Sequence, residues 1–273
     1  GIVYCIGTVT EGVISEGETA DVIVDRKRRE DIARNHTGTH LLQAALRRVL
    51  GPQVNQAGSL VLPDKLRFDF TWPEALTAKQ LAEVEQLVNE QIWKAISLEI
   101  CEMPIAEAKE KGAMALFGEK YGDIVRVVGI KDFSMELCGG SHVVNTGEIG
   151  SFRITGEGGI GSGIRRIEAI TGKAAYEAMK ADRDLIHEMA LRLKSKIEEI
   201  PEKMEKNLSA LKEAERTIEK LKNQHTKDAM DDLLKNVQEK NGVSFFGAVV
   251  PAENMDELRK VADIVKSKLP GGA

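Results

Sequence analysis

The character of the sequence changes at Thr171–Gly172, and this change most constrains the architecture that the chain can adopt. Before it, helical and strand-like patterns alternate and glycines are frequent. After it, Glu, Lys, Leu and Ala predominate, and no strand-like run occurs until Val243. The pattern predicts an α+β domain over residues 1–172, an all-helical, coiled-coil-like segment over 173–242, and a truncated α/β element over 243–273.

The first 172 residues are expected to mix helices with a substantial sheet. Apolar spacing predicts a helix over 26–50, which Gly51 and Pro52 end. Gly38 lies inside this helix, where it costs about 1 kcal/mol relative to Ala, so a packing or functional reason is expected. A capping box at Thr77 and Gln80 opens a second helix. Strands are predicted over residues 2–24 in short pieces, and over 66–71, 98–103, 124–130 and 149–155.

The later part of the chain is expected to form two helices and the start of a further domain. Pro201 suits a first helical turn, so two helices should meet near Ile200. We expect the apolar heptad positions to pack against a second helix, either the neighbour across Pro201 or another chain. These positions are Leu193, Ile197, Ile200, Met204, Leu211, Ala214, Ile218 and Leu221. A buried strand over Val243–Val250 and an amphipathic helix over Met255–Leu269 are predicted to follow. The strand-like start at Gly1 suggests a piece of a longer protein.

Composition excludes several classes of protein. A hydrophobic content of 42% excludes a disordered chain, and a net charge of −5 argues against non-specific coating of nucleic acid. No run approaches 18 apolar residues and no signal-peptide pattern opens the chain, so we expect a cytoplasmic protein with no membrane contact. Basic clusters at 26–29, 47–48 and 165–166 are either solvated faces or local binding patches.

Two short clusters hold three of the five histidines and one of the three cysteines. On a helix, the four-residue step places His36 and His40 one above the other on the same face. Cys138 and His142 have the same step across two glycines, which allow a loop to fold both side chains inward. Together the clusters offer the nitrogen and sulfur ligands that tetrahedral Zn²⁺ accepts, and they predict a shared zinc site.

Two other motifs carry less information. No general base stands between His36 and His40, which argues against a zinc protease. The glycines at 156, 158 and 161 satisfy GxGxxG but lead into a strand-like run, so we interpret them as a flexible loop between strands and not as a dinucleotide site. Cys5 and Cys101 are interpreted as structural strand residues, and His187 and His225 as helical residues without partner ligands.

Five segments then occur in an order that resembles the editing domain of the alanyl-tRNA synthetase family. They are Arg34–Leu42, Gln56–Leu60, Arg67–Phe70, Cys138–His142 and Gly163–Glu168. Threonyl-tRNA synthetases and free-standing trans-editing proteins share the two ligand pairs, so those pairs alone indicate only the superfamily. The Arg67–Phe70 strand, the Arg165–Arg166 segment and the helical coil after it favour the synthetase. The resemblance covers about residues 1–172.

The resemblance implies hydrolysis of the ester that joins serine or glycine to tRNA(Ala), without ligase activity in this chain. A pocket shaped for alanine cannot strongly exclude glycine or serine, so a second, hydrolytic site supplies the discrimination. The implied zinc ligands are His36, His40, Cys138 and His142. The implied catalytic residues are Cys138, Gln56 and Thr39, and the implied substrate-binding residues are Thr37, Thr39, Gln56 and Arg165. In the family, the C-terminal region also binds tRNA and dimerises. The alternatives are a free-standing trans-editing-type deacylase and a non-catalytic, zinc-stabilised module that binds tRNA or a partner.

Overall fold

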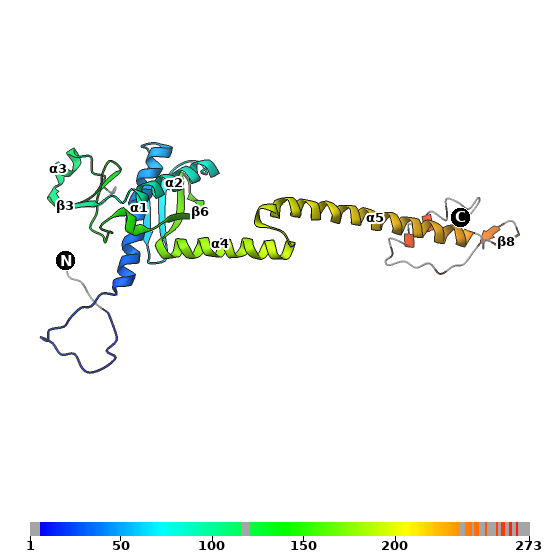
Figure 1. Ribbon diagram of the computed structural model, residues 1–273, viewed down its shortest axis with the longest axis horizontal. Coiled ribbons are helices and arrows are strands. Elements are labelled where there is room, and N and C mark those ends of the chain that lie inside the picture. Colours follow the sequence, from blue (N-terminus) through cyan, green and yellow to red (C-terminus); the bar gives the residue numbers. More distant parts are fainter. Residues whose placement is uncertain are drawn as a thin grey trace. The chain divides into compact units, whose positions relative to one another are not determined.

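The computed structural model describes residues 6–115, 121–234, 238–241 and 243–245, together with residues 249, 255, 258, 259, 262, 263 and 266 (Figure 1). Helices and antiparallel sheets are mixed in these residues, which confirms the predicted α+β class. The chain divides into two units, Gly1–Arg183 and Asp184–Ala273. The three-part division at residues 172 and 242 stays a prediction.

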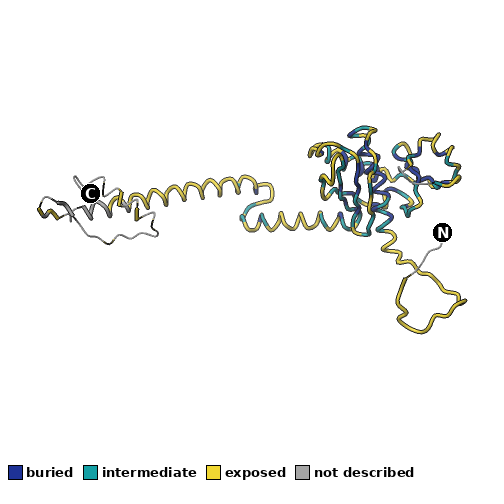
Figure 2. Tube along the Cα trace, turned by 180° about the vertical axis from the view of Figure 1, so that it is seen from behind, coloured by how far each residue is buried: buried dark blue, intermediate teal, exposed yellow. Residues whose placement is uncertain are grey.

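Helix α1 runs over Arg26–Leu50, which is the predicted range. Asp25 caps its first turn by accepting a hydrogen bond from the Arg28 backbone N–H at 2.9 Å. Gly51 ends the helix with a φ of 117°, a conformation that favours glycine. The C-terminal half of α1 is the most buried part of the helix, as the dark segments of Figure 2 show.

The first sheet has four antiparallel strands in the order β1-β2-β7-β6. These are β1 (Gln56–Val61), β2 (Leu66–Thr71), β6 (Phe152–Gly161) and β7 (Ile164–Thr171). The alternation predicted for β2 is confirmed, because Leu66, Phe68 and Phe70 are fully buried. Helix α1 contacts both β2 and β7, so the main core lies between this helix and the sheet.

Gly38 has the packing reason that its place in a helix predicts. A Cβ atom at this position would lie 3.2 Å from Thr171 Cγ2 and 3.4 Å from a methyl group of Leu66. The missing side chain therefore lets α1 approach β2 and β7 closely. This approach brings the histidine-bearing turns of the helix against the rest of the domain.

The second sheet is smaller and has the order β3-β4-β5, again antiparallel. Its strands are β3 (Leu98–Pro104), β4 (Ile124–Ile130) and β5 (Ser134–Leu137). A separate apolar cluster, which includes Ala108 of α3 (Ile105–Glu110), packs against it. Helix α2 (Ala78–Trp93) precedes β3 and begins at the predicted capping box of Thr77 and Gln80. A short 3₁₀ helix, η1 (Thr146–Ile149), follows β5.

The strands predicted over residues 2–24 are wrong for the part that the structure describes. Residues 6–25 form turns and irregular chain, and Ile14, Val22 and Ile23 are exposed. Within the described residues no strand pairs with this segment, and an isolated hairpin is only marginally stable in water. The strand propensity of this segment is therefore not enough to form a strand, because no partner strand lies beside it in the part of the chain that the structure describes. Residues 1–5, including Cys5, lie outside the described residues.

The predicted flexible loop at Gly156–Gly161 is also wrong, because these glycines belong to β6. The strand pairs with β7 through two irregularities, between Ile154 and Gly156 and between Gly159 and Gly161. Glycine tolerates the backbone conformations that such bulges require. The next element is β7 and not a helix, so the segment lacks the context of a dinucleotide site.

The predicted pair of helices is confirmed. Helix α4 covers Gly172–Leu193, α5 covers Ile200–Leu234 with Pro201 in its first turn, and a 3₁₀ turn, η2 (Ile197–Glu199), separates them. Leu211, Ile218 and Leu221 are each more than half exposed. Burial within the chain is therefore wrong for these three heptad positions, although Ile200 is buried. Association of the exposed positions with another chain stays a prediction.

The C-terminal predictions fall mostly outside the described residues. Val243–Phe245 forms strand β9, and it pairs with β8 (Gln238–Lys240), which the sequence did not predict. Val249 is exposed and not in a strand, contrary to the predicted buried strand at that position. Between 255 and 269, the described residues are helical: 255, 258, 259, 262, 263 and 266.

Candidate metal centre

The two predicted ligand pairs meet in the structure. His36 and His40 lie one turn apart on α1, and Cys138 and His142 lie in the loop after β5. One ligand atom from each of the four side chains lies within 4.8 Å of the others; His40 is buried, and the other three residues are half-buried. Residues from distant parts of the sequence therefore form one site, as predicted.

The spacing of these atoms fits a tetrahedral ion. Cys138 Sγ lies 3.5 Å from His36 Nε2 and 3.3 Å from His142 Nε2. Two ligands of a tetrahedral zinc ion, one sulfur and one nitrogen, are separated by about 3.5 Å, given bond lengths of about 2.3 and 2.0 Å. The donor set and its spacing thus suit a metal ion of this size.

Two hydrogen bonds orient the imidazoles toward the site. Thr37 Oγ1 donates its one proton to the Ala33 carbonyl oxygen at 2.9 Å. In its other two contacts it must therefore accept, from the Val143 N–H at 3.2 Å and from His142 Nδ1 at 3.1 Å. The carbonyl oxygen of Ser141 accepts from His36 Nδ1 at 3.2 Å. Each ring therefore carries its proton on Nδ1 and presents the Nε2 lone pair to Cys138, as metal-ligating histidines do.

The loop between Cys138 and His142 has little freedom. Arg126 on β4 donates to the carbonyl oxygens of Cys138 and Gly140, at 2.7 and 3.0 Å. A Cβ atom at Gly140 would overlap the His36 ring, whereas a Cβ atom at Gly139 would meet nothing within 4 Å. The second of the two glycines is therefore required for the loop to approach α1.

Burial keeps the three imidazoles neutral. It is the main cause that lowers the pKa of His36, lowers the pKa of His40 well below its ordinary value, and lowers the pKa of His142 to about 3. The nearby Arg126 guanidinium lowers all three pKa values further. At neutral pH the nitrogen lone pairs are thus free of protons and available to a metal ion.

His40 has a carboxyl group behind it. Its Nδ1 lies 3.7 Å from Glu136 Oε2, and both side chains are buried. Burial raises the pKa of Glu136 to about 8, although the hydrogen bond from Ser134 Oγ lowers it. The Glu136 carboxyl group and the His40 ring are therefore both neutral near pH 7, and their contact is not an ion pair. His40 Nδ1 faces this carboxyl group without a hydrogen bond at this distance.

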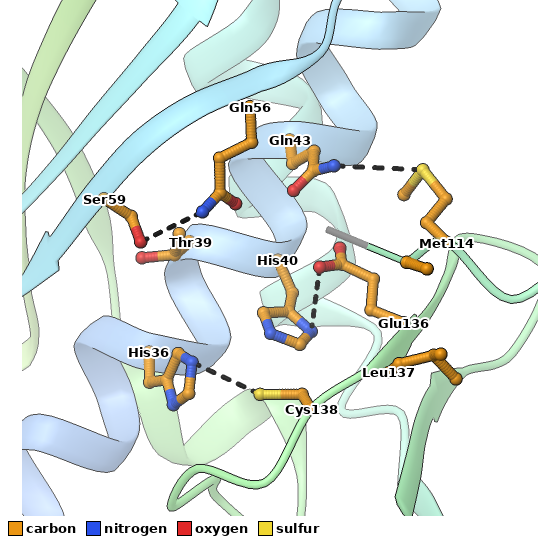
Figure 3. Close-up of a pocket in the computed structure, with 11 residues that line it drawn as sticks. His36, Thr39, His40, Gln43, Gln56, Ser59, Met114, Glu136, Leu137 and Cys138 are labelled. Carbon is orange, nitrogen blue, oxygen red and sulfur yellow. Dashed lines mark hydrogen bonds and ion pairs between the residues drawn. The ribbon is translucent and has the colours of Figure 1, made fainter. Parts of the chain in front are cut away.

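A cavity of about 60 Å³ adjoins His36, His40 and Cys138 (Figure 3). Its polar lining includes Thr39 and Gln56, two of the predicted catalytic and substrate-binding residues. Thr39 Oγ1 donates to the Asn35 carbonyl oxygen, and Gln56 Nε2 donates to Ser59 Oγ. The cavity therefore brings these residues next to the metal ligands.

Two other predicted substrate residues lie elsewhere. Thr37 is fully buried and its hydroxyl holds His142, as described above. Arg165 on β7 donates two hydrogen bonds to Glu157, at 2.6 and 2.8 Å, and does not line the cavity. Their roles toward a substrate stay predictions.

Gln43, Arg126 and Glu136 also belong to the site, but they were not predicted from the sequence. Gln43 continues the face of His36, Thr39 and His40 at helical spacing, and that spacing was the available signal. Glu136 lies in β5, two residues before Cys138. In extended chain, side chains two residues apart point to the same side, so this spacing was a signal for Glu136. Nothing in the local sequence marked Arg126.

The chain is similar to known proteins over the segments that form this site. The family described as the threonyl and alanyl tRNA synthetase second additional domain matches residues 125–168, which include Cys138 and His142. Alanine–tRNA ligase of Listeria monocytogenes serotype 4b (strain F2365) is 48% identical over 265 residues, or 97% of this chain and 30% of that protein. The enzyme of Desulforamulus reducens is 45% identical over 272 residues, or 100% of this chain and 31% of that protein. The chain is homologous to a segment of alanine–tRNA ligase.

This relationship extends beyond the metal centre. A third alanine–tRNA ligase, from Geobacillus kaustophilus, is 48% identical over 261 residues, which are 96% of this chain. The matches thus include the helical region as well as the α+β unit. The chain spans about 30% of the length of the alanine–tRNA ligases that it matches. In the part of the chain that the structure describes, no helix is long and apolar enough to cross a membrane.

Proposed function

We propose that this chain is a zinc-dependent deacylase that removes serine and glycine from mischarged tRNA(Ala). The observation that carries the proposal is the set of four ligand atoms within 4.8 Å of one another, beside a cavity with polar lining. The homology to alanine–tRNA ligase supports tRNA(Ala) as the partner. The activity belongs in the cytoplasm, where aminoacyl-tRNA is used.

His36, His40, Cys138 and His142 would hold the zinc ion. With all four ligands bound, zinc would position the aminoacyl group, and it would polarise the carbonyl only if one ligand left or the shell expanded to five. In the reaction, the oxygen of water ends on the carboxylate of the released amino acid. The ester C–O bond breaks, and the 3′ oxygen of the tRNA leaves as a hydroxyl group.

The chain's own residues would supply the shape of the site. Thr37 and the Ser141 carbonyl hold two ligand rings in the required tautomer, and Arg126 holds the loop. Thr39 and Gln56 would face the aminoacyl group from α1 and β1, because both line the cavity. The cavity is small enough to favour glycyl and seryl groups over larger ones.

The test is metal content together with deacylation. Purified chain should contain about one zinc ion, measured by plasma mass spectrometry, and should hydrolyse Ser-tRNA(Ala) faster than Ala-tRNA(Ala). The double variant Cys138→Ala, His142→Ala should lose both properties. Full zinc content in that variant would refute the four-residue site. Zinc-loaded chain that hydrolyses no aminoacyl-tRNA would leave the non-catalytic module as the better interpretation.

We also propose that α5 pairs with a second copy of the chain. Leu211, Ile218 and Leu221 are spaced as heptad positions, yet all three are more than half exposed in the single chain. Sedimentation equilibrium should show a dimer that Leu211→Lys with Leu221→Lys converts to monomer. A wild-type chain that stays monomeric up to a concentration of about 100 μM would contradict the pairing.

A further inference from the structure

Gln43 has an unsatisfied polar atom beside the metal centre. The residue is only 6% exposed, and its Oε1 atom has no hydrogen-bond partner in the described structure. The Nε2 atom has one weak contact, with Met114 Sδ at 3.8 Å. A buried carbonyl oxygen without a partner is uncommon in folded proteins and calls for an explanation.

The unsatisfied atom belongs to the cavity described above. Gln43 lines it, four residues after Thr39 and three after His40 on the same face of α1. In Figure 3 the Gln43 amide lies between the side chains of Gln56 and Met114. The cavity volume of about 60 Å³ exceeds the roughly 10–15 Å³ that one ordered water molecule needs. A small polar group therefore has room to reach this amide.

Other polar atoms around the cavity already have partners. The hydroxyl proton of Thr39 goes to the Asn35 carbonyl oxygen, and Gln56 Nε2 donates to Ser59 Oγ. Glu136 Oε1 accepts from Ser134 Oγ. Among the buried side-chain atoms that line this cavity, Gln43 Oε1 and His40 Nδ1 are the two without a partner in the described structure, and only Gln43 Oε1 is an acceptor whatever its protonation.

We propose that Gln43 is a specificity-determining residue, whose amide oxygen accepts a hydrogen bond from the side-chain hydroxyl of a seryl ester. This inference rests on the proposed deacylase function and names the group that recognises its substrate. A hydroxyl satisfies the buried carbonyl. An alanyl methyl group in the same place excludes water and leaves the side-chain carbonyl of Gln43 without a hydrogen bond. The site therefore disfavours the alanyl ester. A glycyl ester leaves the space open to water.

Binding of non-hydrolysable analogues tests the inference without relying on catalysis. The probes are 3′-seryl-, 3′-alanyl- and 3′-glycylamino-3′-deoxyadenosine, in which an amide replaces the ester. Zinc-loaded wild-type chain, titrated by calorimetry, should bind the seryl analogue about tenfold more tightly than the alanyl analogue. Gln43→Met, which keeps the length of the side chain, should reduce this ratio to about twofold or less and leave glycyl affinity unchanged. Gln43→Asn, which withdraws the amide by one methylene, should also reduce the ratio.

Gln91→Met is the matched control. Gln91 is 4% exposed, lies on α2 and does not line the cavity, so this variant should keep the tenfold ratio. All variants should keep the zinc content of the wild type. The inference is overturned if the wild type binds the seryl and alanyl analogues equally or binds neither, or if the ratio persists in both Gln43 variants. Hydrolysis of Ser-tRNA(Ala) is measured in parallel. A wild type that shows the Gln43-dependent ratio without hydrolysis would support the role of Gln43 and refute the deacylase.

Discussion

Thr171 Oγ1 donates a 2.7 Å hydrogen bond to Asn35 Oδ1 across 136 positions of sequence. Both side chains are buried. The amide nitrogen of Asn35 donates in turn to the carbonyl oxygens of Leu62 and Pro63, at 2.7 and 3.2 Å. One side chain thus ties α1 to the end of β7 and to the turn between β1 and β2, directly beside His36.

Replacing Asn35 should be costly for stability. Asn35→Ala leaves the Thr171 hydroxyl and two carbonyl oxygens without their partner, and we expect a loss of about 2–4 kcal/mol in the free energy of unfolding. Urea denaturation followed by circular dichroism measures it. Asn55→Ala is the control. Asn55 is exposed and its side-chain amide donates to the carbonyl oxygen of Gln53, two residues away, so this variant should cost under about 1 kcal/mol. Similar losses in both variants would contradict the importance of the buried network.

The two glycines of the Cys138–His142 loop should differ sharply when replaced. A Cβ atom at Gly140 overlaps the His36 ring, whereas the space around Gly139 is open. Gly140→Ala should therefore lose most bound zinc during dialysis, and Gly139→Ala should retain it. Metal analysis of the two dialysed variants decides the point. Equal retention would mean that the loop does not need to approach α1 this closely.

Thr37 should affect metal affinity without touching the metal. Thr37→Val keeps the shape of the side chain but removes the oxygen that accepts from His142 Nδ1. Loss of such a partner typically weakens metal binding by about 10- to 100-fold. Thr37→Ser keeps the hydroxyl and should stay close to wild type. Competition with a chromophoric chelator gives both affinities, and an unchanged affinity in Thr37→Val would show that His142 needs no orienting partner.

Gln56 should influence the reaction more than the metal. Gln56→Met removes a polar group from the cavity. Gln56 Nε2 has a second proton besides the one that it donates to Ser59 Oγ, and a seryl hydroxyl that donates to Gln43 can accept it. We therefore expect the variant to raise the barrier to Ser-tRNA(Ala) hydrolysis by about 1–3 kcal/mol, with a smaller effect on Gly-tRNA(Ala). Single-turnover assays on both substrates measure the difference. Equal losses on the two substrates, together with reduced zinc content, would assign Gln56 to the architecture of the metal centre.

The sequence predicted those features that depend on local pattern. The range of α1, the buried face of β2 and the capping box at Thr77 follow from apolar spacing and hydrogen-bonding chemistry within a few residues. The metal ligands were also predictable, because two histidines and a Cys–His pair share the same four-residue step.

Features that depend on distant partners were not predictable in the same way. The segment 6–25 has strand-like residues but no strand beside it, and Gly156–Gly161 becomes a strand only because β7 pairs with it. Gln43 shares the helical face of His40, so its place was open to prediction, whereas Arg126 reaches the Cys138–His142 loop only because β4 pairs with β5, which no local pattern reports.

The ligand pairs lie far apart in the chain, since Cys138 and His36 are separated by 102 positions. An unfolded chain offers an ion only one pair at a time, so full coordination waits until a long loop has closed. Ion uptake should therefore come late in folding and slow unfolding more than it accelerates refolding. The bound ion would therefore stabilise the folded domain against unfolding and would not nucleate its folding.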